Sequence, residues 1–166
     1  MTRSPAVDVV IDSPLWNSVP GAKPVVRRAI KAAATPVLEH LQTGSESEVA
    51  IVLTDDAAIQ ALNRQWRGRD QPTNVLSFPS PSPQPSGTGP RLLGDVIIAY
   101  ETTAREAEAR GLPLGHHLAH LAVHGFLHLL GYDHESDKEA EAMERLEREI
   151  LARLDVPDPY AFHDGA

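Results

Sequence analysis

The chain has 166 residues, 42% of them hydrophobic, which suits one domain spanning residues 1–166 with a substantial buried core. It contains no cysteine, so disulfides and thiolate metal sites are excluded, and any metal must be held by His, Asp or Glu. The formal net charge of -8 argues against a protein that coats nucleic acid nonspecifically, although it leaves room for a local basic site.

The N-terminal stretch MTRSPAVDVVIDSPLW has only a short apolar run, which aspartates interrupt. We therefore expect no signal peptide, no membrane span and a cytoplasmic location. Within it, the β-branched residues of segment 7–11 predict a strand. Apolar residues then recur at helical spacing from about Pro24 to Leu41 and predict the first helix.

The middle of the chain alternates strand and helix signals. Residues 49–55 (VAIVLTD) predict a second strand, after which Thr54 or Asp55 is suited to cap a helix that runs to about Trp66. Residues 73–78 (TNVLSF) predict a short third strand.

A segment rich in Pro, Ser and Gly, residues 79–90, follows and has few apolar residues to bury, so we expect a flexible, exposed loop. Residues 92–100 (LLGDVIIAY) predict the fourth strand. A helix is expected from about Thr102 to Arg110, and Gly111 is suited to end it.

Two more helices are predicted, one from about Leu114 to Leu130, ended by Gly131, and one opened by the capping-box sequence that begins at Ser136. The last helix has an apolar stripe of Met143, Leu146, Ile150 and Leu154. The order of elements is not a regular strand–helix alternation. It predicts an α+β domain in which about five helices pack on a mixed sheet of about four strands.

The segment HGFLHLLGYDH carries three histidines, His124, His128 and His134, near the end of this central helix. Residues four apart share one face of a helix, so His124 and His128 can present two imidazoles to one ion. Gly131 can adopt a positive φ, which lets the chain turn and bring His134 back as a third ligand. Three nitrogen ligands with an open fourth position are typical of a catalytic zinc site, with one Zn²⁺ per chain.

The histidines also have simpler explanations. His124, His128 and His134 could be ordinary buried or surface side chains that bind no metal. His120 lies one turn before His124 and could hydrogen-bond the site, whereas His116 and His117 are expected to form a polar edge of the helix. We assign no role to His40 and His163.

The spacing of the motif also fits the metzincin protease pattern H-E-x-x-H-x-x-G-x-x-H. Gly125, however, occupies the position at which such a protease needs its general-base glutamate. A metalloprotease-like hydrolase lacking that residue is therefore a minority hypothesis.

Several segments together resemble the YbeY family of bacterial metal-dependent endoribonucleases, which act in ribosomal RNA maturation. They are HGFLHLLGYDH with the preceding AHLAVHG (119–125), LNRQWRGRDQPTNVLSFP (62–79), LLGDVIIA (92–99) and DPY (158–160). Asn74 departs from the pattern, since many members have Asp there, and the 79–90 loop is a second departure. The resemblance implies a zinc ion on His124, His128 and His134.

The resemblance also implies a functional arginine, and Arg67 is the residue that matches. A guanidinium can hold the phosphate oxygens on which charge builds during phosphodiester cleavage, so Arg67 and His124 are expected to be catalytic. Arg64 and Arg69 could extend a local basic patch, although Arg64 is equally explained as a solubilising surface residue. Trp66 is a candidate for stacking on an RNA base, or else a core position of its helix.

Four residues are weaker candidates for the site. Asp133 could orient a ligand or simply belong to the turn, and Thr73, Ser77 and Asp95 could line the site. Asp133 or Asp95 as a fourth ligand would instead favour a non-catalytic ribosome assembly factor with a structural zinc.

The sequence and the resemblance together predict a zinc-dependent, single-strand-specific endoribonuclease in 16S rRNA maturation and ribosome quality control. The expected partners are ribosomal RNA, the small ribosomal subunit and ribosome-associated proteins, with neither DNA nor membrane.

Overall fold

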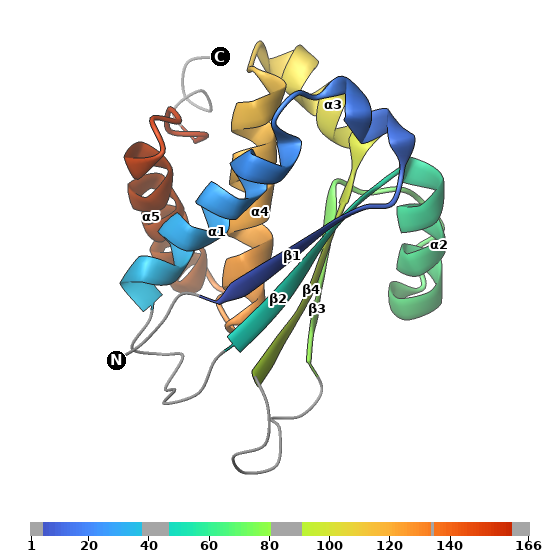
Figure 1. Ribbon diagram of the computed structural model, residues 1–166. Helices are drawn as coiled ribbons and strands as arrows, with labels where there is room; N and C mark the ends of the chain where they lie inside the picture. Colours follow the sequence, from blue (N-terminus) through green and yellow to red (C-terminus); the bar gives the residue numbers. More distant parts are fainter. Residues whose placement is uncertain (1–4, 38–46, 81–90, 134, 161–166) are drawn as a thin grey trace.

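Four strands form one mixed sheet, in the order β1–β2–β4–β3 (Figure 1). The computed structural model describes residues 5–37, 47–80, 91–133 and 135–160. Its strands are β1 (Ala6–Ile11), β2 (Ser47–Thr54), β3 (Val75–Pro79) and β4 (Arg91–Ala99). β1, β2 and β4 run parallel, whereas β3 pairs antiparallel with β4 and forms one edge of the sheet. All four predicted strands are confirmed.

Five α-helices accompany the sheet among the described residues, which confirms the α+β class. They are α1 (Ala22–Val37), α2 (Asp56–Arg67), α3 (Tyr100–Arg110), α4 (Leu114–Leu129) and α5 (Asp137–Arg153). A short 3-10 helix, η1 (Pro14–Ser18), was not predicted. The predicted end of the first helix at Leu41 and residues 81–90 of the predicted loop lie outside the described residues.

Two helix N-termini are capped by the predicted side chains. The Asp55 carboxylate accepts a hydrogen bond from the backbone N–H of Ala58 (2.9 Å), and the Ser136 hydroxyl accepts one from that of Glu139 (3.1 Å). Each cap satisfies an N–H group that has no partner within its own helix, and so fixes where α2 and α5 begin.

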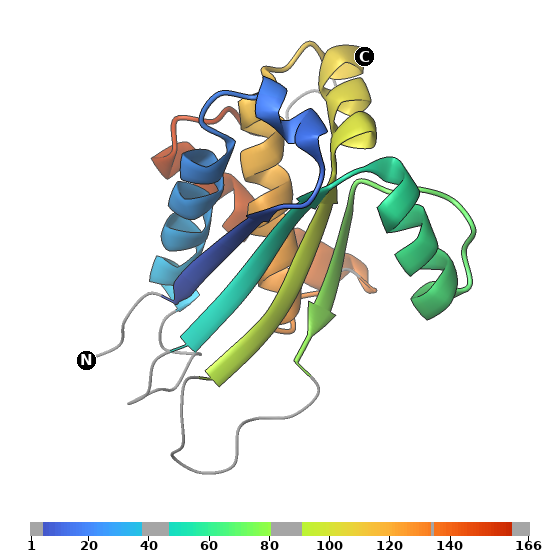
Figure 2. The ribbon, with the colours of Figure 1, turned by 45° about the vertical axis from the view of Figure 1, so that its right-hand side comes forward.

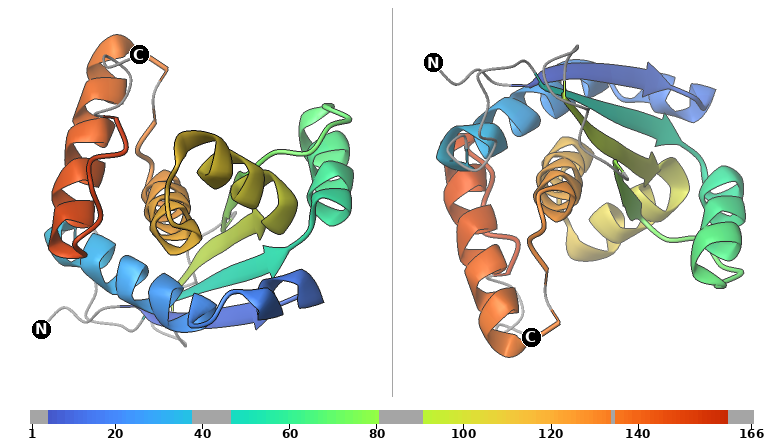
Figure 3. Two further views of the ribbon diagram at one scale, coloured as in Figure 1. Left: turned by 90° about the horizontal axis from the view of Figure 1, so that it is seen from above. Right: turned by 90° about the horizontal axis from the view of Figure 1, so that it is seen from below.

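The helices lie on both faces of the sheet, as the views from above and below show (Figure 3). The main core joins α1, α4 and α5 to inward side chains of the strands, among them Ile51, Leu53, Val96 and Ile98. The opposite face carries a smaller cluster, in which Ile59 of α2 packs on Leu76, Ile97 and Ala99. α2 therefore lies on the other face of the sheet from α1, α4 and α5, beside the strands β3 and β4, and its first turn contacts α3 (Figure 2).

α4 is the central helix and contacts α1, α3, α5, β3 and β4. It approaches the sheet tightly at Gly125, where a Cβ atom would lie 2.5 Å from Cγ1 of Val96. The Ser77 hydroxyl also donates a hydrogen bond to the Gly125 carbonyl (2.9 Å). These contacts fix the position of the histidine-bearing end of α4 over β3 and β4.

The chain turns sharply just after α4. Gly131 has a φ of +98°, as the sequence predicted, and this conformation is accessible to glycine because it has no Cβ. No helix among residues 5–37, 47–80, 91–133 and 135–160 is long and apolar enough to span a bilayer.

Candidate metal centre and active site

His124 and His128 face one another across one turn of α4, as their spacing predicts. Their Nε2 atoms are 3.0 Å apart, and their ring centroids are 4.5 Å apart. Both side chains are partly exposed, so the pair is open to solvent on one side. The third predicted ligand, His134, lies outside the residues that the structure describes.

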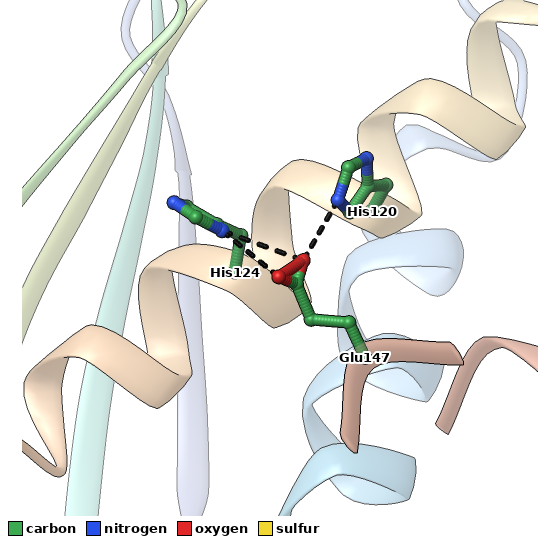
Figure 4. A group of neighbouring side chains, drawn as sticks. All are labelled: His120, His124 and Glu147. Carbon is green, nitrogen blue, oxygen red and sulfur yellow. Dashed lines mark hydrogen bonds and ion pairs between the residues drawn. The ribbon is translucent and has the colours of Figure 1, made fainter. Parts of the chain in front are cut away.

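Glu147 of α5 points toward His120 and His124 of the same helix, as Figure 4 shows. Its carboxylate oxygens lie 3.3 and 3.4 Å from Nδ1 of His124, and one of them lies 2.8 Å from Nε2 of His120. The hydroxyl of Tyr160 donates to the same carboxylate at 2.9 Å. Glu147 is fully buried, and these three side chains satisfy a carboxylate that would otherwise be costly to bury.

The charge of Glu147 follows from these contacts. Burial alone would raise its pKa, but the hydrogen bonds and charges of His120 and His124 outweigh burial and lower its pKa from 4.5 to about 2. Burial and the negative charge of Glu147 together raise the pKa of the Tyr160 hydroxyl, which therefore stays a hydrogen-bond donor. Glu147 is thus an acceptor at neutral pH.

An ionised Glu147 selects one tautomer of His124. Because the carboxylate accepts only, Nδ1 of His124 must carry the proton that it shares with Glu147. In a neutral imidazole the lone pair then lies on Nε2, the atom that faces His128. A carboxylate behind a histidine is the usual arrangement around a metal-binding imidazole.

Among the residues that the structure describes, two groups of donor atoms that share His124 could hold a metal. One is the pair of Nε2 atoms on His124 and His128, whose 3.0 Å separation is close to the roughly 3.3 Å between two nitrogens on a tetrahedral zinc. The other comprises His120, Nδ1 of His124 and Glu147, whose donor atoms all lie within 4.8 Å of one another. In that second group, the 2.8 Å between Nε2 of His120 and a Glu147 oxygen is an ordinary hydrogen-bond length. The Tyr160 hydroxyl also donates a hydrogen bond to the same carboxylate.

A cavity of about 450 Å³ opens over the first donor pair. Its described lining residues come from α2, from the loop before β3, from β3 and from the end of α4 and its turn: Arg67, Asn74, Val75, Ser77, Pro79, His124, His128, Gly131, Tyr132 and Asp133. The structure therefore brings Arg67, the predicted phosphate-binding residue, to the same cavity as His124 and His128, two of the three predicted ligands. Of the weaker candidates, Ser77 and Asp133 line it, whereas Thr73 does not.

Asp95 is not part of this site. Its neighbour Val96 points toward α4, so strand alternation directs Asp95 to the other face of the sheet, where it lines a different cavity. The prediction that Asp95 lines the site is wrong, and Asp95 does not lie near enough to serve as a fourth ligand.

A second cavity of about 330 Å³ shares His124, Asn74 and Val75 with the first. His117 was predicted to form a polar edge, but it is buried and lies 2.8 Å from a carboxylate oxygen of Glu106. The side-chain amide of Asn74 donates to the same oxygen (2.9 Å). Burial would raise the pKa of Glu106, but these two hydrogen bonds and the charges of His117 and Arg110 lower it.

Sequence reasoning missed the role of Glu147 and placed Tyr160 only within a motif. Glu147 lies on the acidic helix α5, where it resembles its exposed neighbours in composition. A signal was nevertheless present, because Glu147 falls four residues after Met143 and three before Ile150, on the buried stripe. A carboxylate on an apolar stripe calls for a buried partner.

Comparison with known proteins points to one family. The family model described as Endoribonuclease YbeY matches residues 18–155. A relative described as Endoribonuclease YbeY, from Rhodopseudomonas palustris (strain BisB18), is 56% identical over 99% of this chain and 98% of its own length. Another of that description, from Bradyrhizobium diazoefficiens, is 53% identical and covers 97% of this chain and 88% of its own. The solution structure of TM1509 from Thermotoga maritima is 22% identical, with a TM-score of 0.47, over 90% of this chain and 91% of its own.

Proposed function

The chain belongs to the YbeY endoribonuclease family, and we propose on this basis that it is a metal-dependent endoribonuclease whose active site is the cavity over His124 and His128. One observation carries the assignment of the site. His124 and His128, whose Nε2 atoms are 3.0 Å apart, and Arg67 from another element line a single cavity. Metal ligands next to a phosphate-binding group are what phosphodiester cleavage requires.

In this proposal His124, His128 and His134 hold one zinc ion. The set consists only of nitrogen donors in a chain without cysteine, which suits zinc. When bound, zinc would supply a Lewis acid that polarises a phosphate oxygen or lowers the pKa of a water molecule. Glu147 holds the tautomer of His124 that directs Nε2 to the ion, and it does so from a buried position that water does not reach.

Arg67 binds the scissile phosphate. Its guanidinium presents several N–H donors in one plane, so it can hold two phosphate oxygens at once and stabilise the charge that develops on them. His124 and His128 lie in the same cavity as Arg67, so one phosphate can be reached by both groups. Arg67 and His124 are the proposed catalytic residues, and no described residue is assigned as the general base.

The substrate proposed from family membership is single-stranded ribosomal RNA of the small subunit, with roles in 16S rRNA maturation and ribosome quality control. Ribosome-associated proteins are the proposed partners, DNA and membranes are not, and the cytoplasm is the proposed location. The net charge of -8 favours a substrate delivered at a local basic site over general electrostatic capture.

Two alternatives are less well supported. A protease of the metzincin type needs a glutamate at position 125, where even a Cβ would clash with Val96. An assembly factor with a structural zinc needs a closed set of four ligands, and Asp95 lies on the other face of the sheet. Asp133 lines the cavity, so its carboxylate could serve as the fourth zinc ligand in such a site.

Cleavage of a single-stranded rRNA fragment tests the proposal. We expect the metal-loaded protein to cleave it, the chelator-treated protein to lose activity, and readdition of zinc to restore it. His124→Ala should be inactive in all three conditions. Wild-type activity no greater than that of a mock purification would overturn the endoribonuclease assignment and favour the assembly factor, and cleavage of peptides but not RNA would favour the protease.

A further inference from the structure

Trp66 is an exposed aromatic residue at the C-terminal end of α2. The apolar face of this helix begins with the buried Ile59 and continues through the half-buried Leu62, but Trp66 is 64% exposed. Leaving an indole in water forgoes much of the stabilisation that a core position would give. The interpretation of Trp66 as a core residue is therefore wrong, and its indole is accessible to a ligand.

The Trp66 ring has an aromatic neighbour in the sheet. It contacts Phe78 of β3, with ring centroids 6.3 Å apart and planes at 63°. This edge-to-face contact holds the indole at the edge strand of the sheet and leaves ring surface accessible. Phe78 itself points to the face of the sheet that carries α2 and Asp95. Its neighbours Ser77 and Pro79 line the cavity over His124 and His128, so the indole lies across the edge strand β3 from that cavity.

Trp66 is also the neighbour of Arg67 in the chain. Consecutive Cα atoms are about 3.8 Å apart, and neighbouring side chains of a helix point in different directions, so Arg67 lines the cavity while Trp66 lies against Phe78 of the edge strand. Gly68 ends α2 in the left-handed conformation (φ 68°), which turns the chain immediately after Arg67. A strand of RNA that passes over the edge strand β3 can therefore meet both the indole and Arg67.

The turn after α2 is held in place and carries further positive charge. The Asn63 side chain donates to the Gln71 carbonyl (2.9 Å), and the Gln60 side chain donates to the Asp70 carboxylate (3.0 Å). Arg69 is exposed in this turn, next to Arg67. In an acidic chain, two exposed arginines beside an exposed indole form a local surface that favours a polyanion with aromatic groups.

We propose that Trp66, supported by Phe78, stacks on an unpaired base of the RNA next to the phosphate held by Arg67. This inference rests on the proposed function and adds a specificity-determining residue to it. A duplex keeps its bases stacked on one another, so it cannot offer a free face to the indole, whereas a single strand can. Trp66 thus provides a physical reason for a preference for single-stranded RNA.

The test is binding of a 2′-O-methyl oligouridine and of a 2′-O-methyl RNA duplex to the metal-loaded protein, followed by fluorescence anisotropy. Base stacking on an aromatic residue contributes about 1–3 kcal/mol, so Trp66→Ala should bind the single strand roughly 5- to 150-fold more weakly. It should bind the duplex as wild type does, and Trp66→Tyr should retain most of the single-strand affinity. Leu15→Ala, which removes an exposed apolar side chain (41% exposed) elsewhere, is the matched control.

Intrinsic fluorescence gives an independent readout, because the other tryptophan, Trp16, is 1% exposed and donates to the Thr54 carbonyl (2.8 Å). Oligouridine should quench the tryptophan emission of wild type, because it covers Trp66. It should leave the emission of Trp66→Tyr, which comes from Trp16, unchanged. Wild-type affinity in Trp66→Ala would overturn the inference and assign the indole to a protein contact, while RNA cleavage would still support the proposed function. Trp66-dependent binding without cleavage would support the inference and overturn the activity. Failure of wild type to bind either RNA would overturn both.

Discussion

The Glu147 carboxylate lies 3.3 Å from Nδ1 of His124, and Nε2 of the same imidazole lies 3.0 Å from Nε2 of His128. One histidine therefore connects a fully buried carboxylate on α5 with a partly exposed imidazole on α4. This relationship joins the interior of the protein to the proposed metal site, and it gives Glu147 a testable positioning role.

Glu147→Gln is expected to weaken zinc binding without removing a proposed ligand. The amide cannot fix the His124 tautomer as a carboxylate does, and loss of such a partner typically costs 10–100-fold in metal affinity. Competition with a chromophoric zinc chelator measures this change. Glu149→Gln, an exposed carboxylate on the same helix, is the matched control and should bind zinc like wild type. Equal zinc affinity in both variants would remove Glu147 from the positioning role.

Glu147 should also make stability depend on pH in the acid range. Its pKa in the folded protein is about 2, below the ordinary 4.5, so its stabilising contribution is complete above pH 4.5. This contribution is lost as the pH falls from 4.5 toward 2, because the carboxylate must then be protonated. In metal-free protein, the difference in urea midpoint between wild type and Glu147→Gln should shrink over this range. A difference that stays constant there would contradict the assigned pKa.

Gly125→Ala should destabilise the protein because its Cβ would lie 2.5 Å from Cγ1 of Val96 and 3.1 Å from the Ser77 hydroxyl. Overpacking of this kind typically costs about 1–3 kcal/mol. Gly115→Ala on the same helix meets no atom within 4 Å and should stabilise the helix by about 0.5–1 kcal/mol. Thermal unfolding of the two variants should therefore shift in opposite directions. If Gly125→Ala melts at or above the wild-type temperature, the close approach of α4 to β4 is misjudged.

Local sequence signals predicted most of the fold. Asp55 and Ser136 cap the helices that their positions indicated, and Gly131 makes the predicted turn, because each acts on neighbouring backbone. The histidine pair was predictable for the same reason, since residues 124 and 128 share one helix turn.

Long-range features were not predictable in this way. Glu147 reaches His124 only because α4 and α5 pack together, and spacing within either helix does not reveal that contact. Trp66 has core-like helical spacing, yet the sheet ends at β3 and leaves it uncovered. Asp95 follows strand alternation to the face away from α4, which became evident only once the position of α4 was known.

Arg67→Ala should keep the fold and the zinc but lose RNA cleavage. Removing one group that stabilises developing negative charge typically lowers kcat by about 10²–10³. Single-turnover cleavage of an rRNA fragment, with metal content measured on the same sample, tests this expectation. Arg28→Ala, an exposed arginine on α1, is the control and should cleave at the wild-type rate. Undiminished cleavage by Arg67→Ala would exclude that residue from the active site.

The most direct test of the central claim is zinc content by elemental analysis of untagged wild type, His128→Ala and His120→Ala. Binding on the Nε2 side of His124 predicts one zinc per chain in wild type and in His120→Ala, and its loss in His128→Ala. The reverse result, with zinc kept by His128→Ala and lost from His120→Ala, would instead place the metal among His120, His124 and Glu147 and contradict the site proposed here.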